Sequence, residues 1–388
     1  MKIIQFHPSK SDTLKGGSET IETMFKNVSD KNDILSLTIR ELVQNSLDNK
    51  KNEKVNVNIR LENIEYDFAD FNSLDKCIND CLKTEKKESE RNRLFKLKSK
   101  IKEGFKSKTL IIEDNSGGLD GKSRIQYNGD IPGLEKILGE NFSDKDPNDL
   151  GSFGVGKISA LLASDIQTVF YVNSVDNNNK IIGKTLLSGY RSPNSMDYSG
   201  PEIYCGEPKV INNSIKIDYS DCDLKTYNLL RKINGNGLST IIPIGEKIDD
   251  FPISWLNRAI FSCINSYFQK IESDRLEVII EDVETNEKIF INKSSYKRLY
   301  RELEEVFRGE DLDFEINKLN FNYLLLRPVI LGERPIKKIK EELKFNLFKE
   351  NEIEEKFNGY AEITFYENEK LEELIDLERL TNDFKYNF

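Results

Sequence analysis

The chain has 388 residues, of which 37% are apolar and 10% aromatic, and a formal net charge of −10. This length and apolar content predict two ordinary domains with hydrophobic cores, and they exclude a disordered tail. No segment contains the run of about eighteen uncharged apolar residues that a membrane span needs, and the first residues lack the apolar stretch of a signal peptide. We therefore expect a cytoplasmic protein with no membrane partner. The acidic balance argues against a surface that coats nucleic acid.

The cysteines and the single histidine narrow the chemistry further. Five scattered cysteines, an odd number, indicate free thiols in a reducing compartment. Cys77 and Cys81 could share a helical face, but no second Cys or His pair lies near them, so a zinc site is the weaker interpretation. His7 is the sole histidine. It cannot by itself support histidine-centred catalysis, and we interpret it as structural.

The first predicted elements are a helix followed by two strands. Residues 34–48 (ILSLTIRELVQNSLD) predict a helix, because apolar side chains recur at three- and four-residue spacing. The stripe consists of Leu35, Ile39, Leu42, Val43 and Ser46. From residue 55, VNVNIRL alternates apolar and polar residues, which predicts a half-buried strand. TLIIED at 109–114 predicts a second strand, and NSGG after it predicts a turn.

A charged insert at 71–108 separates these two strands. From Lys83 to Lys108 the sequence has eleven Lys or Arg and four Glu, a net charge of +7. We favour a solvated helical insert. A contact with nucleic acid or with an acidic partner is the alternative.

The remaining elements predict a lid, a glycine loop and a second domain. Residues 119–150 are polar and long for a connector, which favours a functional lid. The stretch from Gly151 passes from a glycine loop into an apolar helix, and 166–172 and 237–244 predict strands. The pattern resets near residue 246. A helix from Trp255 and strands at 275–283, 321–330 and 359–366 follow, so we expect domains at 1–245 and 246–388.

Three polar residues share one face of the first helix. At about 100° per residue, Asn45 lies about 40° and Asp48 about 20° from Glu41, away from the apolar stripe. A carboxylate one turn from an amide suits water activation beside a metal, with Glu41 accepting a proton and Asn45 supplying an oxygen ligand. The bland alternative, equally weighted from this helix alone, is a polar face turned to solvent.

Two further motifs suit a nucleotide. Asp114 ends an apolar strand, where a carboxylate can accept a hydrogen bond from an amine such as adenine N6, although a strand ending in DNSGG is by itself more often a plain turn. Gly151, Gly154 and Gly156, followed by Lys157, form a glycine-spaced loop that can present N–H groups to phosphate. The segment nearly matches a Walker A motif, but Ile158 replaces the Ser or Thr of that motif and no apolar strand precedes it.

The order ELVQNSLD, IIEDNSGG, GSFGVGK and then a strand at Ser239–Ile242 resembles the GHKL superfamily (gyrase, heat-shock chaperone, histidine kinase, MutL) and its Bergerat ATP-binding fold. ELVQNSLD in particular looks like the corresponding helix of MutL-type and MORC-type ATPases. The resemblance covers residues 20–245. It implies an α+β fold, with a mixed and mostly antiparallel sheet layered with helices, followed by a smaller α/β transducer-like domain.

The resemblance also implies residue roles. Glu41 is implied to be the general base and Asn45 the magnesium ligand, while Asp48 would support the purine pocket and Asp114 would bind the adenine amine. The other nucleotide-binding positions that it implies are Gly118, Gly151, Gly154, Val155, Gly156, Lys157 and Thr240, with Thr240 beneath the adenine near Asp114. Ser116 and Ser239 depart from the glycines usual in the family, which puts details of the adenine pocket in question.

The function implied is a magnesium-dependent ATPase that acts as a conformational switch. ATP and Mg²⁺ would be its cofactors, and nucleotide would drive homodimerisation. The basic insert and the MutL- or MORC-like helix suggest service in DNA repair or in defence against foreign DNA, with DNA or a nuclease or other effector protein as partner. The alternatives are a non-hydrolysing ATP sensor or scaffold and a chaperone-like ATPase. The histidine-kinase branch is disfavoured because His7 does not lie on a dimerising helix.

Overall fold

The computed structural model describes residues 3–11, 34–48, 53–101, 104–118, 155–187, 190–191, 198–211, 214–249, 253–309, 337–349 and 352–365. The chain divides into two compact units, Met1–Leu299 and Tyr300–Phe388. Among the described residues, no helix has the length and apolarity needed to cross a membrane. The predicted lid at 119–150 and the predicted strand at 321–330 lie outside the described residues.

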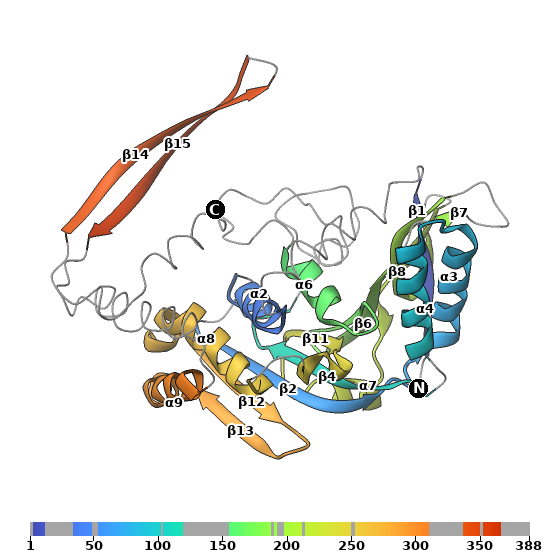
Figure 1. Cartoon of the computed structure of the whole chain (residues 1–388), viewed down its shortest axis with the longest axis horizontal. Helices are drawn as coiled ribbons and strands as arrows, with labels where there is room; N and C mark the ends of the chain where they lie inside the picture. The colour runs from blue at the N-terminus through green and yellow to red at the C-terminus, as the bar shows by residue number, and fades with distance from the viewer. Residues whose placement is uncertain are drawn as a thin grey trace. The chain divides into compact units, whose positions relative to one another are not determined.

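One large sheet organises the first unit (Figure 1). Its strand order is β13-β12-β2-β4-β11-β5-β6-β8-β1-β3, with β10 beside β6 and with β7 and β9 beside β8. The described strands are β1 (Ile4–Ser11), β2 (Val55–Glu65), β3 (Ala69–Asp70), β4 (Lys106–Asp114), β5 (Thr168–Val175), β6 (Asn178–Leu186), β7 (Tyr190–Arg191), β8 (Tyr198–Ile211), β9 (Ser214–Asp218), β10 (Ser220–Asp221), β11 (Gly237–Pro243), β12 (Leu276–Asp282) and β13 (Glu287–Ile291). Among these, β1–β3 and β12–β2 pair in parallel and the other pairs are antiparallel. The predicted mixed, mostly antiparallel α+β sheet is confirmed.

Helices are layered on this sheet. They are α2 (Ile34–Asp48), α3 (Phe71–Thr84), α4 (Glu88–Lys100), α6 (Val155–Ala163), α7 (Leu224–Leu230) and α8 (Trp255–Glu272), with a 3-10 turn η1 at Gly245–Asp249. A further helix, α9 (Tyr296–Gly309), crosses the boundary between the two units. The predicted helix at 34–48 is confirmed, and its apolar stripe is buried. α2 packs between α6 and α8. Ser262 and Tyr267 of α8 fix it there by donating hydrogen bonds to the carbonyl oxygens of Ser36 and Arg40.

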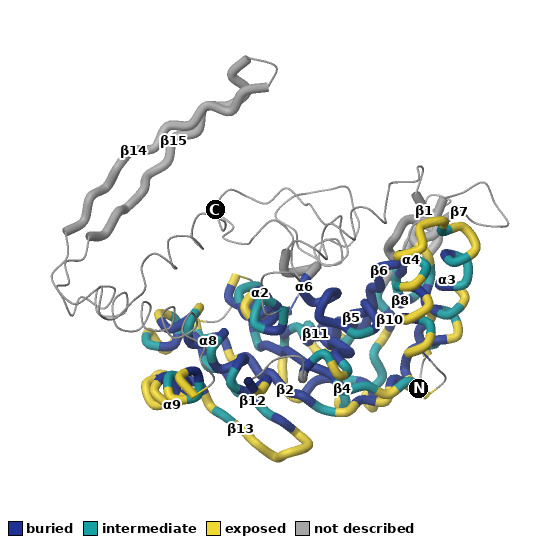
Figure 2. Tube along the Cα trace, in the orientation of Figure 1, coloured by how far each residue is buried: buried dark blue, intermediate teal, exposed yellow. Residues whose placement is uncertain are grey.

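The charged insert is a helical hairpin that shares one hydrophobic core with the sheet. Phe71, Leu74, Ile78 and Cys81 of α3 and Leu94 and Leu97 of α4 are buried in one cluster that also contains Phe6 of β1, Phe170 of β5 and Tyr66 after β2. Figure 2 shows the buried inner side and the exposed outer side of these helices. Burial raises the pKa of the Cys77 thiol to about 12, so this cysteine is a neutral packing residue.

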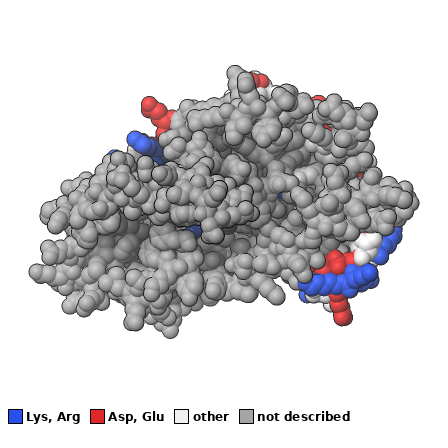
Figure 3. All heavy atoms as spheres, turned by 90° about the horizontal axis from the view of Figure 1, so that it is seen from above, with Lys and Arg blue, Asp and Glu red and all other residues white. Residues whose placement is uncertain are grey.

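Many cations of the insert are already paired within the fold. Arg93 binds Glu90, Lys98 lies 3.6 Å from Asp75, and Lys100 binds Asp165. Figure 3 shows basic and acidic side chains intermingled at the right-hand end of the molecule, over these helices. These pairings favour a solvated helical hairpin over a dedicated polyanion surface.

The structure groups residues 246–299 with the first compact unit, while the predicted domains at 1–245 and 246–388 stay a prediction. β12 extends the main sheet, pairing in parallel with β2 from Leu276–Val55 to Asp282–Leu61. α8 packs on α2. These elements bury their apolar faces against the large sheet and α2, so they do not form a separate core. In the second unit, β14 (Lys337–Lys349) and β15 (Glu352–Phe365) form an antiparallel hairpin.

The prediction that β2 is half-buried is wrong for the central residues of the strand. Asn58 and Arg60, on the predicted polar face, are as buried as their apolar neighbours. The cause is Glu113 on the adjacent β4, whose Oε1 accepts hydrogen bonds from Arg60 Nη1 at 2.5 Å and Asn58 Nδ2 at 3.0 Å. Paired in this way, the polar groups can be covered by α7 and the segment after it.

Candidate nucleotide-binding site

Asp114 is held in one orientation by four hydrogen bonds at the end of β4. Its Oδ1 accepts the backbone N–H of Ser116 at 2.9 Å, the Ser116 hydroxyl at 2.7 Å and the Leu238 N–H at 3.2 Å. Its Oδ2 accepts the hydroxyl of Ser46 at 2.7 Å. The carboxylate is 5% exposed. It therefore presents Oδ2, which has a second lone pair, in a fixed direction beside α2.

Ser46 links this carboxylate to α2. The sequence assigned Ser46 to the apolar stripe of the helix, and its side chain indeed points inward, but its buried hydroxyl bridges to Asp114. Because α2 also carries Glu41 and Asn45, this contact joins the helix that bears both residues directly to the end of β4. The sequence analysis noted Ser116 only as a departure from a family glycine and Ser46 only as part of the apolar stripe, so it missed that both hydroxyls bind Asp114.

The three polar residues of α2 differ in exposure. Glu41 is buried, Asn45 is half-buried, and Asp48 is exposed and accepts a 2.7 Å hydrogen bond from Gln44. Arg40 lies with its Nη2 3.2 Å from Glu41 Oε1. The catalytic role of Glu41, the magnesium role of Asn45 and the purine-pocket role of Asp48 stay predictions.

Below α2, burial raises the pKa of the Tyr267 hydroxyl, with a smaller contribution from the negative charges of neighbours that include Glu41. The hydroxyl therefore stays protonated and can donate its hydrogen bond to the Arg40 carbonyl oxygen. This bond fixes the turn of α2 that carries Glu41 from beneath.

The glycine turn after Asp114 packs tightly on β5. Gly118 has φ +68, and a Cβ there would lie 2.8 Å from the Ser174 carbonyl oxygen and 2.9 Å from Asn173 Oδ1. Both the backbone conformation and the lack of space require glycine. The predicted requirement for a small residue at this position therefore has a packing cause in addition to any approach by a base.

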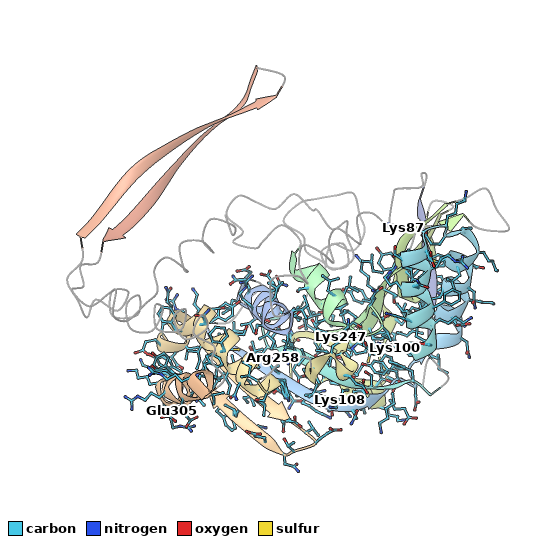
Figure 4. All side chains as sticks on the ribbon, viewed as in Figure 1. Lys87, Lys100, Lys108, Lys247, Arg258 and Glu305 are labelled. Carbon is cyan, nitrogen blue, oxygen red and sulfur yellow. The ribbon has the colours of Figure 1, made fainter. Side chains whose placement is uncertain are left out.

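The glycine loop leads into a helix, as predicted. Gly151 and Gly154 lie outside the described residues, and α6 begins at Val155, so Val155, Gly156 and Lys157 form its first turn. Lys247 Nζ donates to the carbonyl oxygens of Leu162 at 3.0 Å and Ser164 at 2.9 Å. It thereby caps the other end of α6 (Figure 4). A helix N-terminus of this kind favours anions.

Thr240 is buried in β11, where it pairs with Ile112 of β4 and Tyr171 of β5. It lies on the same sheet face as Asp114. The register places Leu238, two residues earlier, opposite Asp114, and the Leu238 backbone makes the hydrogen bond. The position of Thr240 beneath the base and its contact with nucleotide stay predictions.

Gly237 is the point of closest approach between β11 and the site. A Cβ there would lie 1.9 Å from the Asp114 carbonyl oxygen and 2.4 Å from Arg231 Nη2. We expect Gly237→Ala to destabilise the fold by about 3 kcal/mol, because the backbone must move apart. Urea unfolding measures the loss. Gly309→Ala is the control, because no atom lies within 4 Å of its Cβ position; equal stability of the two variants would contradict the tight approach at Gly237.

The comparisons with known proteins were made by sequence and by structure. No protein-family model and no curated protein matches the sequence. Among solved structures, the 43K ATPase domain of Thermus thermophilus gyrase B in complex with an aminocoumarin matches at probability 1.00, TM-score 0.32 and 11% identity, over 69% of this chain and 49% of that chain. The ATP-binding domain of Francisella tularensis topoisomerase IV in complex with a small-molecule inhibitor matches at TM-score 0.34 and 13% identity, over 78% and 59%.

The chain spans between about half and three fifths of the length of the two structures. At TM-scores of 0.32 and 0.34 the superposition carries no argument about function. The functional assignment therefore rests on the residues of this chain and on their placement.

Proposed function

We propose that this chain binds ATP and hydrolyses it with magnesium, using α2, the end of β4 and the start of α6 as its site. The orientation of Asp114 carries the proposal. A nearly buried carboxylate whose Oδ1 receives three donors can offer Oδ2 to an amine donor, which the adenine ring of ATP supplies. The same carboxylate bonds to the helix that bears Glu41 and Asn45.

The donor set of α2 suits magnesium. Mg²⁺ takes oxygen ligands and keeps several waters, so one amide oxygen from Asn45 together with phosphate oxygens is a sufficient set. Among the described residues no group of three or more His, Cys, Asp or Glu could hold a metal, which fits an ion held largely by the nucleotide. When bound, magnesium offsets the charge of the phosphates.

The chain's own residues would divide the remaining work. Glu41 accepts the proton of the attacking water, and the tertiary contacts of α2 hold this carboxylate in place. The first turn of α6, with Lys157, lies at the positive end of a helix and binds phosphate oxygens. Loss of the γ-phosphate removes contacts that hold the closed state, so the chemistry drives a conformational switch.

The biological setting we propose is a nucleotide-gated homodimer that serves DNA repair or defence against foreign DNA with partner proteins. The support is the MutL- or MORC-like sequence of α2 and the basic α3–α4 hairpin, although much of the hairpin's charge is paired internally. A non-hydrolysing ATP sensor is the second candidate. It is favoured by the contact of Arg40 with Glu41 Oε1, which occupies one oxygen of the proposed base.

The deciding experiment is ATP hydrolysis by the purified chain with magnesium and with EDTA, beside ATP binding and sedimentation with and without nucleotide. We expect magnesium-dependent turnover at roughly 10⁻²–10 per second, within the span of slow switch ATPases and ordinary enzymes. Tight binding without turnover would favour the sensor. Absence of ATP binding would overturn the proposal, and turnover unchanged by duplex or single-stranded DNA would remove the DNA setting while leaving the ATPase.

A further inference from the structure

Arg231 is a buried cation immediately after α7. Its side chain is 2% exposed, and its Nη2 donates to the carbonyl oxygens of Asp114 at 2.8 Å and Gly235 at 3.2 Å. Nη1 donates to the Ser239 hydroxyl at 3.0 Å, and Nε has no hydrogen-bond partner among the residues that the structure describes. All three acceptors are neutral. A buried guanidinium with neutral partners costs stability, so folding alone gives little reason for it.

The position of Arg231 explains its use. The β4–β11 pairing runs from Thr109–Pro243 to Glu113–Ser239 and stops one residue before Asp114. At Asp114, side-chain hydrogen bonds replace the backbone pairing with β11. The Asp114 carboxylate accepts a hydrogen bond from the Leu238 N–H, and the Asp114 carbonyl oxygen accepts one from Arg231 Nη2. The direction of the carboxylate therefore depends on a backbone that the β2 pairing holds on one side, at Val57–Asp114, and that Arg231 holds on the β11 side.

The segment that carries Arg231 is anchored independently on the other face of the sheet. Glu113 Oε2 accepts the N–H groups of Lys232 at 2.7 Å and Ile233 at 3.1 Å, and Arg60 Nη2 donates to the Leu229 carbonyl oxygen at 2.9 Å. Adjacent residues of β4 thus serve opposite faces, with Glu113 fixing the α7 segment and Asp114 facing α2. Because of this anchor, removing the Arg231 guanidinium should leave the segment in place and release mainly Asp114.

We propose that Arg231 is the positioning residue for base recognition: it fixes the Asp114 backbone so that the carboxylate meets an exocyclic amine. It acts through Asp114 and does not contact the nucleotide. This role rests on the function proposed above, and it extends that function from ATP binding to the choice of base. It predicts that Arg231 controls selectivity between a 6-amino purine and a 6-oxo purine more than it controls phosphate binding.

The test compares ATP with inosine triphosphate, which carries an oxygen in place of the amine. In Arg231→Met we expect ATP affinity to fall roughly tenfold or more, the scale of one lost hydrogen bond to a charged group. The affinity for inosine triphosphate should change little, so the ratio of ATP affinity to inosine triphosphate affinity should fall by about the same factor as the ATP affinity. Arg231→Lys retains the charge and some donors, and should give an intermediate ratio.

Arg258→Met is the matched control. Arg258 is a similarly buried arginine on α8 (Figure 4), and it donates to the Ile248 carbonyl oxygen. It should lower stability without changing the ratio. A ratio equal to that of wild type in both Arg231 variants overturns the proposal, as does an equal loss for the two nucleotides.

A second measurement needs no nucleotide. Amide exchange of the Leu238 N–H should accelerate in Arg231→Met, because its acceptor, the Asp114 carboxylate, loses its fixed position. Unchanged exchange contradicts the role. If the wild-type chain binds neither nucleotide, the proposed ATPase function fails, and the Leu238 exchange rate still decides whether Arg231 positions Asp114.

Discussion

Replacing Glu41 with alanine is expected to leave ATP binding intact and to lower kcat by roughly 10²–10⁴, the usual contribution of a general base. The reason is that Glu41 is proposed to act on the attacking water, while other elements hold the adenine ring and the phosphates of ATP. ATP affinity by titration and single-turnover hydrolysis separate the two effects. The ion pair with Arg40 joins a half-exposed side chain, so its loss should matter little to stability.

Two variants sharpen this test. Glu41→Gln keeps the shape and should hydrolyse as poorly as Glu41→Ala. Glu277→Ala removes another carboxylate that pairs with a cation, Lys54 at 2.8 Å on the β12 side of the sheet, and should hydrolyse like wild type. If Glu41→Ala hydrolyses ATP as fast as wild type, Glu41 is not the general base. If wild-type turnover is itself negligible, the non-hydrolysing sensor is the better account.

Asp114→Asn is expected to weaken ATP binding by roughly a hundredfold while the fold persists. The amide oxygen can keep the three donors that reach Oδ1, and the new amino group can donate to Ser46 Oγ, whose own hydroxyl hydrogen then goes to the Leu42 carbonyl oxygen 3.0 Å away. The adenine amine, however, then meets a donor instead of an acceptor, which costs the desolvation of both groups. Calorimetric titration and thermal unfolding of the same samples measure both properties.

Inosine triphosphate provides the internal check for this variant. Its 6-oxo group accepts from the new amide, so Asp114→Asn should bind it at least as well as ATP, reversing the preference of wild type. Ser46→Ala is the companion variant, because it removes one donor to Asp114 and leaves the carboxylate. It should weaken ATP binding less than Asp114→Asn. Equal ATP affinity in Asp114→Asn and wild type would show that Asp114 does not receive the adenine amine.

Local patterns predicted the central elements of the site. The three- and four-residue spacing of Leu35, Ile39, Leu42 and Val43 defines α2, because a helix can bury one stripe only in that phase. The apolar run before Asp114 defines β4. The order of the motifs then indicated a superfamily. For these elements the information lies within a dozen residues, where periodicity and turn chemistry act directly.

Contacts between distant residues were not readable in this way. The parallel pairing of β12 with β2 joins segments more than two hundred residues apart, and nothing in either strand specifies the other as its partner. This pairing places β12 in the first compact unit. The burial of Arg60 depends on its ion pair with Glu113. From the sequence alone, Glu113 looks like an ordinary solvent-facing residue of its strand, and its partner is known only once the neighbouring strand is placed.

The sequence by itself determined the α+β class, the helix bearing Glu41 and Asn45, the strand ending in Asp114, and the start of α6 after the glycine loop. Tertiary structure alone decided that Ser46, Ser116 and Leu238 fix the Asp114 carboxylate, and that Arg231 holds its backbone. The physical reason is range. Hydrophobic periodicity is a property of neighbouring residues, whereas a hydrogen bond between residues 46 and 114, or 114 and 231, exists only after the sheet has assembled.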